Sequence, residues 1–157
     1  MSGLARPRRP LIPPPLIALA CGAIMWAIAR KTGLAPLEFP GRAALAALLA
    51  GAGLLIDLVS VAAFIRAKTT VNPLAPERSN ALVVEGLYRF SRNPMYLGML
   101  LILLGWAAWL GQPLALIIAA AFVFLIERMQ ILPEERALEE KFGDDYRAYK
   151  KRVRRWI

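Results

Sequence analysis

Residues 95–126 read MYLGMLLILLGWAAWLGQPLALIIAAAFVFLI, in which the apolar blocks 95–110 and 113–126 are joined by the short turn 111–113. The whole stretch lacks a charged side chain. A membrane-spanning helix needs about 20 mostly apolar residues, with a range of about 17 to 25. Each block reaches that length if its helix continues a few residues beyond its apolar part. Because so short a turn makes neighbouring helices antiparallel, the stretch predicts a helical hairpin across a membrane.

Two further apolar blocks precede this hairpin. Residues 11–29 include no charged side chain, and residues 43–65 include one, Asp57. Hydrophobic residues make up 58% of the 157 residues, above their usual share in soluble domains. We therefore predict an all-α integral membrane protein with about four transmembrane helices. An ionisable side chain inside a span is costly, so Asp57 is either functional or a polar contact between helices, and the sequence leaves both open.

A cleaved signal peptide is the alternative interpretation of residues 11–29, since Arg6, Arg8 and Arg9 precede them. The consecutive prolines at 13–15 interrupt the apolar core that such a peptide needs, and a second apolar block follows soon after. We therefore expect the first block to remain as a span.

Basic residues are distributed unevenly between the two sides of a four-helix protein. Three precede the first block, five lie between the second and third, and nine follow the fourth, whereas only Arg30, Lys31 and Arg42 fall on the other side. Because cytoplasmic loops carry an excess of Lys and Arg, we expect both termini in the cytoplasm, at a bacterial inner membrane. Anionic lipid accounts for the net charge of +9, so we expect membrane lipids as partners and no nucleic acid.

The residues after the fourth block have an amphipathic pattern. Apolar and aromatic side chains recur at helical spacing, at Leu138, Phe142, Tyr146, Tyr149 and Val153. We predict a C-terminal amphipathic interfacial helix that is interrupted at Gly143. Between the second and third blocks, residues 81–90 favour a short extended piece.

The residue inventory excludes several kinds of catalysis. The chain has no histidine and one cysteine, Cys21, so His-dependent acid–base chemistry, Ser-His triads and an internal disulfide are excluded. No metal-ligand spacing and no Gly-rich phosphate loop is present, so we predict no metal site. We expect Cys21 to serve helix packing. Carboxylates, arginines, tyrosines and backbone groups remain for any chemistry.

These remaining groups form three clusters: one at the entrance to the third helix, one beyond the fourth and one in the tail. Their members are, in that order, Gly86, Tyr88, Arg92, Asn93, Pro94 and Tyr96; Glu134 and Glu135; and Tyr146, Tyr149, Arg154 and Arg155. Because the hairpin returns the first two clusters to the same membrane face, they can converge. Together the clusters offer carboxylates for a cation or for ribose hydroxyls, aromatic faces for adenine or a sulfonium, and arginines for an anion.

Each cluster also has a purely structural interpretation. Asn93 and Pro94 are typical of the cap and the first residue of a helix. Glu134 and Glu135 could offset the dipole of a new helix, and the arginine-rich end could anchor the chain to lipid. The occurrence of all three clusters together favours a functional site.

The segments TTVNPLAPERSNALVVEGLYRFSRNPMYLG (69–98) and PEERALEEKFGDDYRAYKKRVRRWI (133–157) resemble the bacterial branch of the isoprenylcysteine carboxyl methyltransferase and phospholipid methyltransferase superfamily. The family pattern is Arg-His/Asn-Pro-x-Tyr before one span and Glu-Glu after the next, then Phe-Gly-x-x-Tyr-x-x-Tyr and Val-x-Arg. All of it occurs here in order, and the resemblance covers residues 69–157.

The resemblance implies S-adenosylmethionine as methyl donor and S-adenosylhomocysteine as product, bound on the cytoplasmic side between the hairpin and the C-terminal segment. The cofactor-binding residues that it implies are Gly86, Leu87, Tyr88, Arg92, Asn93, Pro94, Tyr96, Glu134, Glu135 and Tyr146. The catalytic residues that it implies are Arg155, Tyr149 and Glu135, and Arg155 could hold an acceptor carboxylate. The chain would then be one methyltransferase domain (1–157), with an N-terminal helix pair (1–66) and a cofactor-binding core (67–157).

Two positions depart from the eukaryotic prenylcysteine enzymes. Asn93 stands where they carry histidine, and Leu87 stands where they usually carry proline. Bacterial relatives also carry asparagine, so the resemblance still implies cofactor binding, but the acceptor does not follow.

We expect methyl transfer to a lipophilic acceptor at the cytoplasmic membrane face, most like prenylcysteine carboxyl O-methylation. A phospholipid or small-molecule N- or S-methyltransferase is the first alternative. A non-enzymatic membrane scaffold with a basic lipid-binding tail is the alternative from another class.

Overall fold

The computed structural model describes residues 12–69 and 79–157, which form helices joined by turns and irregular segments. The elements are α1 (Pro14–Lys31), α2 (Arg42–Arg66), the 3-10 helix η2 (Gly86–Arg89), α3 (Pro94–Leu110), α4 (Ala115–Ile126), the π-helical turn η3 (Glu127–Ile131) and α5 (Leu132–Arg152). The described residues include no strand, which confirms the all-α class. Residues 81–90 accordingly form an irregular segment and η2 in place of the extended piece that we expected. Of the basic residues used to predict the orientation, Arg6, Arg8, Arg9 and Arg78 lie outside the described part.

Three helices are long and apolar enough to cross a membrane: α1, α2 and the continuous helix Ala115–Arg152. The 17-residue α3 is a slightly shorter apolar helix. Large side chains on the outer surface, such as Leu19, Leu48 and Phe124, are 60–70% exposed, a pattern that suits lipid better than water. The structure therefore confirms the predicted integral membrane protein, with three to four spans.

The fourth span and the tail are one continuous helix, because η3 joins α4 to α5. In η3 the N–H of Leu132 donates to the carbonyl of Glu127, five residues earlier. Pro133 follows directly, and a proline inside an α-helix lacks a donor and clashes with the carbonyl four residues before it. The wider π-turn accommodates this proline, so the helix continues. Beyond η3, α5 is polar and lies outside the membrane-crossing part, and Gly143 interrupts it with non-helical dihedrals, as predicted.

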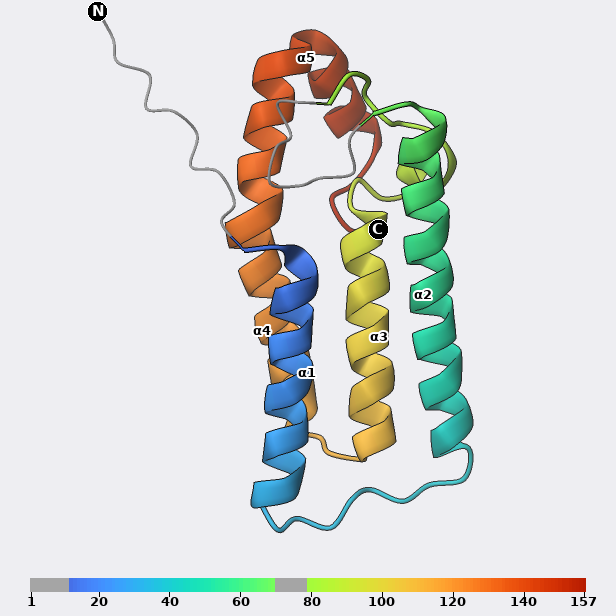
Figure 1. Ribbon diagram of the computed structural model, residues 1–157, viewed down its shortest axis with the longest axis vertical. Coiled ribbons are helices and arrows are strands. Elements are labelled where there is room, and N and C mark those ends of the chain that lie inside the picture. Colours follow the sequence, from blue (N-terminus) through green and yellow to red (C-terminus); the bar gives the residue numbers. More distant parts are fainter. Residues whose placement is uncertain (1–11, 70–78) are drawn as a thin grey trace, which may run out of the picture.

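The helices run side by side, and their connections alternate between the two ends of the bundle (Figure 1). The α1–α2 loop and the α3–α4 turn lie at one end, at the bottom of the view. α5 and the C-terminus gather at the other end, near the start of α3. The hairpin therefore returns the predicted clusters to one end of the bundle.

Small residues allow α2 to pack closely on α3. A Cβ on Gly53 would lie 2.5 Å from the carbonyl oxygen of Gly98, and one on Gly105 would lie 2.8 Å from that of Ala46. Contacts this close require residues without bulk, the usual way in which membrane helices associate.

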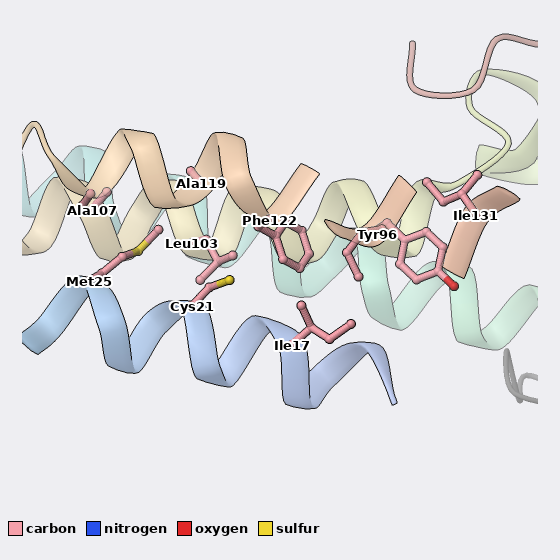
Figure 2. Close-up of a cluster of buried hydrophobic side chains, with 11 residues drawn as sticks. Ile17, Cys21, Met25, Tyr96, Leu103, Ala107, Ala119, Phe122 and Ile131 are labelled. Carbon is pink, nitrogen blue, oxygen red and sulfur yellow. The ribbon is translucent and has the colours of Figure 1, made fainter. Parts of the chain in front are cut away.

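A buried apolar core lies where α1 meets α3 and α4 (Figure 2). Ile17, Cys21 and Met25 recur every fourth residue along one face of α1 and point into this core. Phe122 of α4 is fully buried among them. The lone cysteine therefore belongs to helix packing, as predicted.

Candidate functional site

A cavity of about 330 Å³ opens at the end of the bundle where α3 begins. Its volume falls within the range of pockets that hold small molecules. Predicted site residues from all three clusters line it: Tyr88, Arg92, Asn93, Tyr96, Glu134, Glu135, Tyr146 and Tyr149. They belong to η2, to the start of α3 and to α5, which the fold brings together.

Glu135 is a buried carboxylate, 5% exposed, that two arginines hold. Arg92 Nη2 lies 2.7 Å from its Oε1, and Arg155 Nη2 lies 2.9 Å from its Oε2. Burial alone would raise the pKa of Glu135, but the hydrogen bonds from Arg155 and Arg92 outweigh burial and hold the pKa below its usual value. Glu135 is therefore anionic at neutral pH.

Glu134 has a different environment, although it is the next residue. It faces the cavity and accepts a hydrogen bond from the Tyr96 hydroxyl over 3.1 Å. Burial raises the pKa of Glu134 to about 7; the Tyr96 hydrogen bond acts against this rise, and the charge of Glu135 adds to it. The two carboxylates thus have separated pKa values, an arrangement that suits distinct roles for each.

Arg92 and Asn93 also fasten the C-terminal segment to the start of α3. The Arg92 guanidinium donates to the carbonyls of Val153 (2.7 Å) and Lys150 (3.3 Å) at the end of α5, where a cation offsets the helix dipole. Asn93 Nδ2 donates to the Arg155 carbonyl over 3.0 Å instead of capping α3. Asn93 therefore occupies the cap position that we considered, but its side chain makes no capping hydrogen bond.

Pro94 is the first residue of α3, as predicted, but the dipole role considered for Glu134 and Glu135 is wrong because α5 continues α4 without a free N-terminus.

Tyrosines complete the polar part of the cavity. The Tyr149 hydroxyl donates to the Tyr88 carbonyl over 2.7 Å, and the Tyr88 ring packs edge-on against Phe64 of α2, with centroids 5.4 Å apart. Burial raises the pKa of Tyr149 and of Tyr146, so both phenols stay protonated at neutral pH.

Arg155 does not line the cavity. Its guanidinium binds two carboxylates, Glu135 and Glu127, the first residue of η3. We did not predict Glu127; the available signal was that it is the first charged residue after the fourth apolar block. Arg155 therefore contacts Glu135, which lines the cavity, without lining the cavity itself.

The remaining predicted residues shape the cavity without lining it. Gly86 begins η2 with a left-handed φ of 61°, which favours glycine. The Leu87 carbonyl accepts the backbone N–H groups of Phe90 and Ser91 and so closes the turn. Both residues belong to the 3-10 helix that carries Tyr88, which lines the cavity.

Sequence reasoning missed the apolar walls of the cavity. They are Pro13, Pro14, Pro15, Phe64, Ala81, Leu82, Val83, Met95, Met99 and Leu138, beside Ser79. Met95 and Met99 flank Tyr96 at helical spacing, which was the available signal on α3. Residues from the predicted N-terminal helix pair thus contribute to the same cavity as the predicted core.

An open apolar groove of about 1030 Å³ adjoins the cavity. It runs between α1, α2 and α3, and Pro15 and Met99 line both hollows. Asp57 is the ionisable residue on its walls. The described residues contain no group of three or more Cys, Asp or Glu that could hold a metal ion.

These features define a helical membrane protein with a cavity at one end of its spans, lined by carboxylates, an arginine, tyrosines and apolar side chains. Residues 42–145 match the phospholipid methyltransferase family, and the chain belongs to this family. The match confirms the predicted superfamily, and it supports the prediction that the chain is an enzyme.

The similarity to individual relatives covers shorter stretches. An uncharacterised protein of Haemophilus influenzae is 54% identical over 63 residues, which are 40% of this chain and all of that protein. The protein-S-isoprenylcysteine O-methyltransferase of Schizosaccharomyces pombe is 30% identical over 76 residues, 48% of this chain and 32% of that enzyme. The methanethiol S-methyltransferase 1 of Bradyrhizobium diazoefficiens is 43% identical over 67 residues, 43% of this chain and 22% of that enzyme. The chain thus spans less than half the length of these two named enzymes, and no solved structure matches it.

Proposed function

We propose that the chain catalyses S-adenosylmethionine-dependent methyl transfer to a lipophilic acceptor at the cytoplasmic face of a membrane. The observation that carries this proposal is the cavity in which an anionic carboxylate, a second carboxylate and aromatic side chains share one space beside an apolar groove. Family membership supports the reaction type. The names of the relatives include both O- and S-methyltransferases, so they support no single acceptor.

The residues of the cavity fit S-adenosylmethionine. Nε of Arg92, a residue that lines the cavity, is buried and has no hydrogen-bond partner among the described residues. An unpaired buried donor is costly, and the carboxylate of the cofactor's methionine part would satisfy it. Glu134 would accept hydrogen bonds from the ammonium group or the ribose, and the rings of Tyr96 and Tyr146 offer faces to adenine or to a cation.

The cofactor supplies, when bound, a methyl group that its positively charged sulfur already activates. The chain's own residues then have to orient the acceptor and exclude water. Glu135 keeps Arg92 in place through their ion pair. Glu134 accepts a hydrogen bond or a proton at its carboxylate oxygens near neutral pH. The phenols of Tyr146 and Tyr149 stay protonated, so they act as hydrogen-bonding groups and not as bases.

The acceptor would reach the cavity sideways from the bilayer, along the groove. Pro15 and Met99, which line both hollows, mark the point where a chain in the groove would meet the cofactor. An apolar body in the groove, with its reacting end directed towards the cavity, describes a lipophilic acceptor.

We assign Arg155 a positioning role in place of the acceptor contact that the resemblance suggested. Its guanidinium already binds the carboxylates of Glu127 and Glu135, and it lies outside the cavity wall. It therefore holds Glu135 as an anion and, through it, the guanidinium of Arg92.

The cavity end of the bundle is also its most basic end. Lys150, Lys151, Arg152 and Arg154 follow one another there, at the end of α5 and just beyond it. The positive-inside rule therefore supports a cytoplasmic position for the cavity and for both termini, with the bacterial inner membrane as the location.

The test is calorimetric titration of S-adenosylhomocysteine into the detergent-purified protein. We expect micromolar binding by the wild type and by Glu140→Ala, which changes an exposed carboxylate of the same helix, and loss of binding by Glu135→Ala. Folding of each variant is checked by thermal unfolding. A folded wild type that does not bind would favour the membrane scaffold and overturn the proposed enzyme.

A further inference from the structure

The groove has one polar end and one apolar end. On α3 it extends from Met99 to Trp109, ten residues or about 15 Å of helix. Among the α2 residues that line the groove, Asp57 is the nearest to the cavity, and the walls away from it are Ala, Gly, Leu, Ile and Trp residues. A ligand with one polar end and an apolar body about as long as the groove would therefore have its polar end at Asp57.

Asp57 has no hydrogen bond or ion pair within the described part of the chain, although its charge acts on the nearby Tyr88 phenol. Its Oδ1 is buried without a hydrogen bond, and no salt bridge involves the residue. It lies against Gly98, where a Cβ would collide with the carboxylate. The nearby hydroxyl of Ser60 donates to the Ile56 carbonyl over 2.7 Å and so is already used within α2. An ionisable group within a span is expensive, and an unpaired one points to a partner from outside the chain.

The negative charge of Asp57 determines which kind of head group can bind beside it. Among the described residues no Lys or Arg lines the groove, and an anionic head group would meet Asp57 without a compensating cation from them. A nitrogen that carries N–H groups would supply the missing donor. Asp57 lies nine residues before the end of α2 at Arg66, or about 14 Å along the helix. A phosphate carried to this depth would meet no basic side chain from residues 12–69 or 79–157 along the groove, so a head group without phosphate fits better.

We propose that Asp57 is the acceptor-recognition residue and that the acceptor is a lipophilic amine without a phosphate, its nitrogen at Asp57 and its apolar body along the groove. This inference rests on the proposed function and narrows its acceptor class. The amine would lie where Met99 separates the groove from the cavity, next to the cofactor position.

The experiment measures amine binding directly, without the cofactor. Trp26, Trp106 and Trp109 line the groove, so their fluorescence reports an occupant. The protein is placed in zwitterionic phosphatidylcholine nanodiscs and titrated with bromododecylamine, bromododecanol or bromododecanoate, whose terminal bromine quenches indole emission. We expect saturable quenching by the amine, at least about tenfold tighter than by the alcohol, as a charge-assisted hydrogen bond implies. In Asp57→Asn the amine should bind no more tightly than the alcohol, while alcohol binding stays unchanged.

A second pair of variants tests whether the probe occupies the groove. Ala47 and Ala44 are both exposed on α2, but only Ala47 lines the groove. Ala47→Phe should weaken all three probes, and Ala44→Phe should weaken none.

Equal amine affinity in wild type and Asp57→Asn, or tighter binding of the carboxylate than of the amine, would overturn the inference. Unchanged amine binding in Ala47→Phe would also overturn it. Failure of S-adenosylhomocysteine to bind the wild type would overturn the proposed function alone, since the amine measurement does not need the cofactor.

Discussion

Replacing Glu134 with glutamine removes a carboxyl group whose pKa of about 7 lies well above its ordinary value of 4.5. The unfolded chain returns this group to its ordinary pKa, so the folded protein holds the proton more tightly. One pKa unit corresponds to about 1.4 kcal/mol, and the shift therefore amounts to about 3 kcal/mol of unfolding free energy. Because the pKa is raised on folding, this stability is present in full below pH 4.5 and is lost as the pH rises through 7.

Glutamine resembles the protonated carboxyl group and does not titrate. The variant Glu134→Gln should therefore be about as stable as the wild type in acid and about 3 kcal/mol more stable near pH 8. For a chain of this size, 1 kcal/mol shifts the Tm by about 2–4 °C, so the variant should melt about 6–12 °C higher near pH 8. Thermal unfolding in detergent, followed by tryptophan fluorescence at a series of pH values, measures the difference.

Glu140→Gln is the matched control, because it removes an exposed carboxylate from the same helix and should follow the wild type at every pH. If Glu134→Gln also followed the wild type throughout, Glu134 would not hold its proton in the folded protein, and the separation between the two carboxylates would be refuted. The same variant should bind S-adenosylhomocysteine with a changed pH profile if Glu134 contacts the cofactor.

Three further substitutions test other contacts. Gly98→Ala would press a methyl group into the α2–α3 contact and should lower the free energy of unfolding by about 1–3 kcal/mol through overpacking. Gly51→Ala is the control, because its methyl group meets open space and should not destabilise the protein. Thermal unfolding compares the two variants. Tyr149→Phe leaves the Tyr88 carbonyl without its donor and should cost about 1–3 kcal/mol, measured the same way, and no change in Tm would contradict this. Arg92→Lys keeps the charge but loses the planar guanidinium that binds two backbone carbonyls and a carboxylate. Amide hydrogen exchange along the C-terminal segment should therefore accelerate. Unchanged exchange protection would show that these Arg92 contacts do not hold the segment in place.

The membrane spans could be predicted from the sequence because apolar length alone determines them. The turn at residues 111–113 is too short for anything but a hairpin, and that turn placed Tyr96 and Glu134 at the same end, where their side chains now share a hydrogen bond. Eight of the predicted site residues line the cavity for the same reason.

The parts of the site that could not be predicted depend on side-chain contacts, which the spacing of residues along the sequence does not reveal. We expected Arg155 to face the acceptor, but its guanidinium binds Glu127 and does not line the cavity. Phe64 and the prolines at the start of α1 reach the cavity only because α1 and α2 pack beside α3, and no local pattern specifies that packing. Asp57 could be recognised as unusual from the sequence, but its contact with Gly98 required the structure.

Because α4, η3 and α5 form one helix, Glu134 moves along the membrane normal together with the membrane-spanning part of this helix. The apolar part of this helix, Ala115–Ile126, is about 18 Å long, whereas a typical hydrocarbon core is about 30 Å thick. A short span adapts to a thicker bilayer by thinning it or by moving its flanking residues. Lipids with longer acyl chains should therefore draw Glu134 and Glu135 towards the hydrocarbon, and the thickness of the host membrane would tune the affinity of the cavity for its ligand.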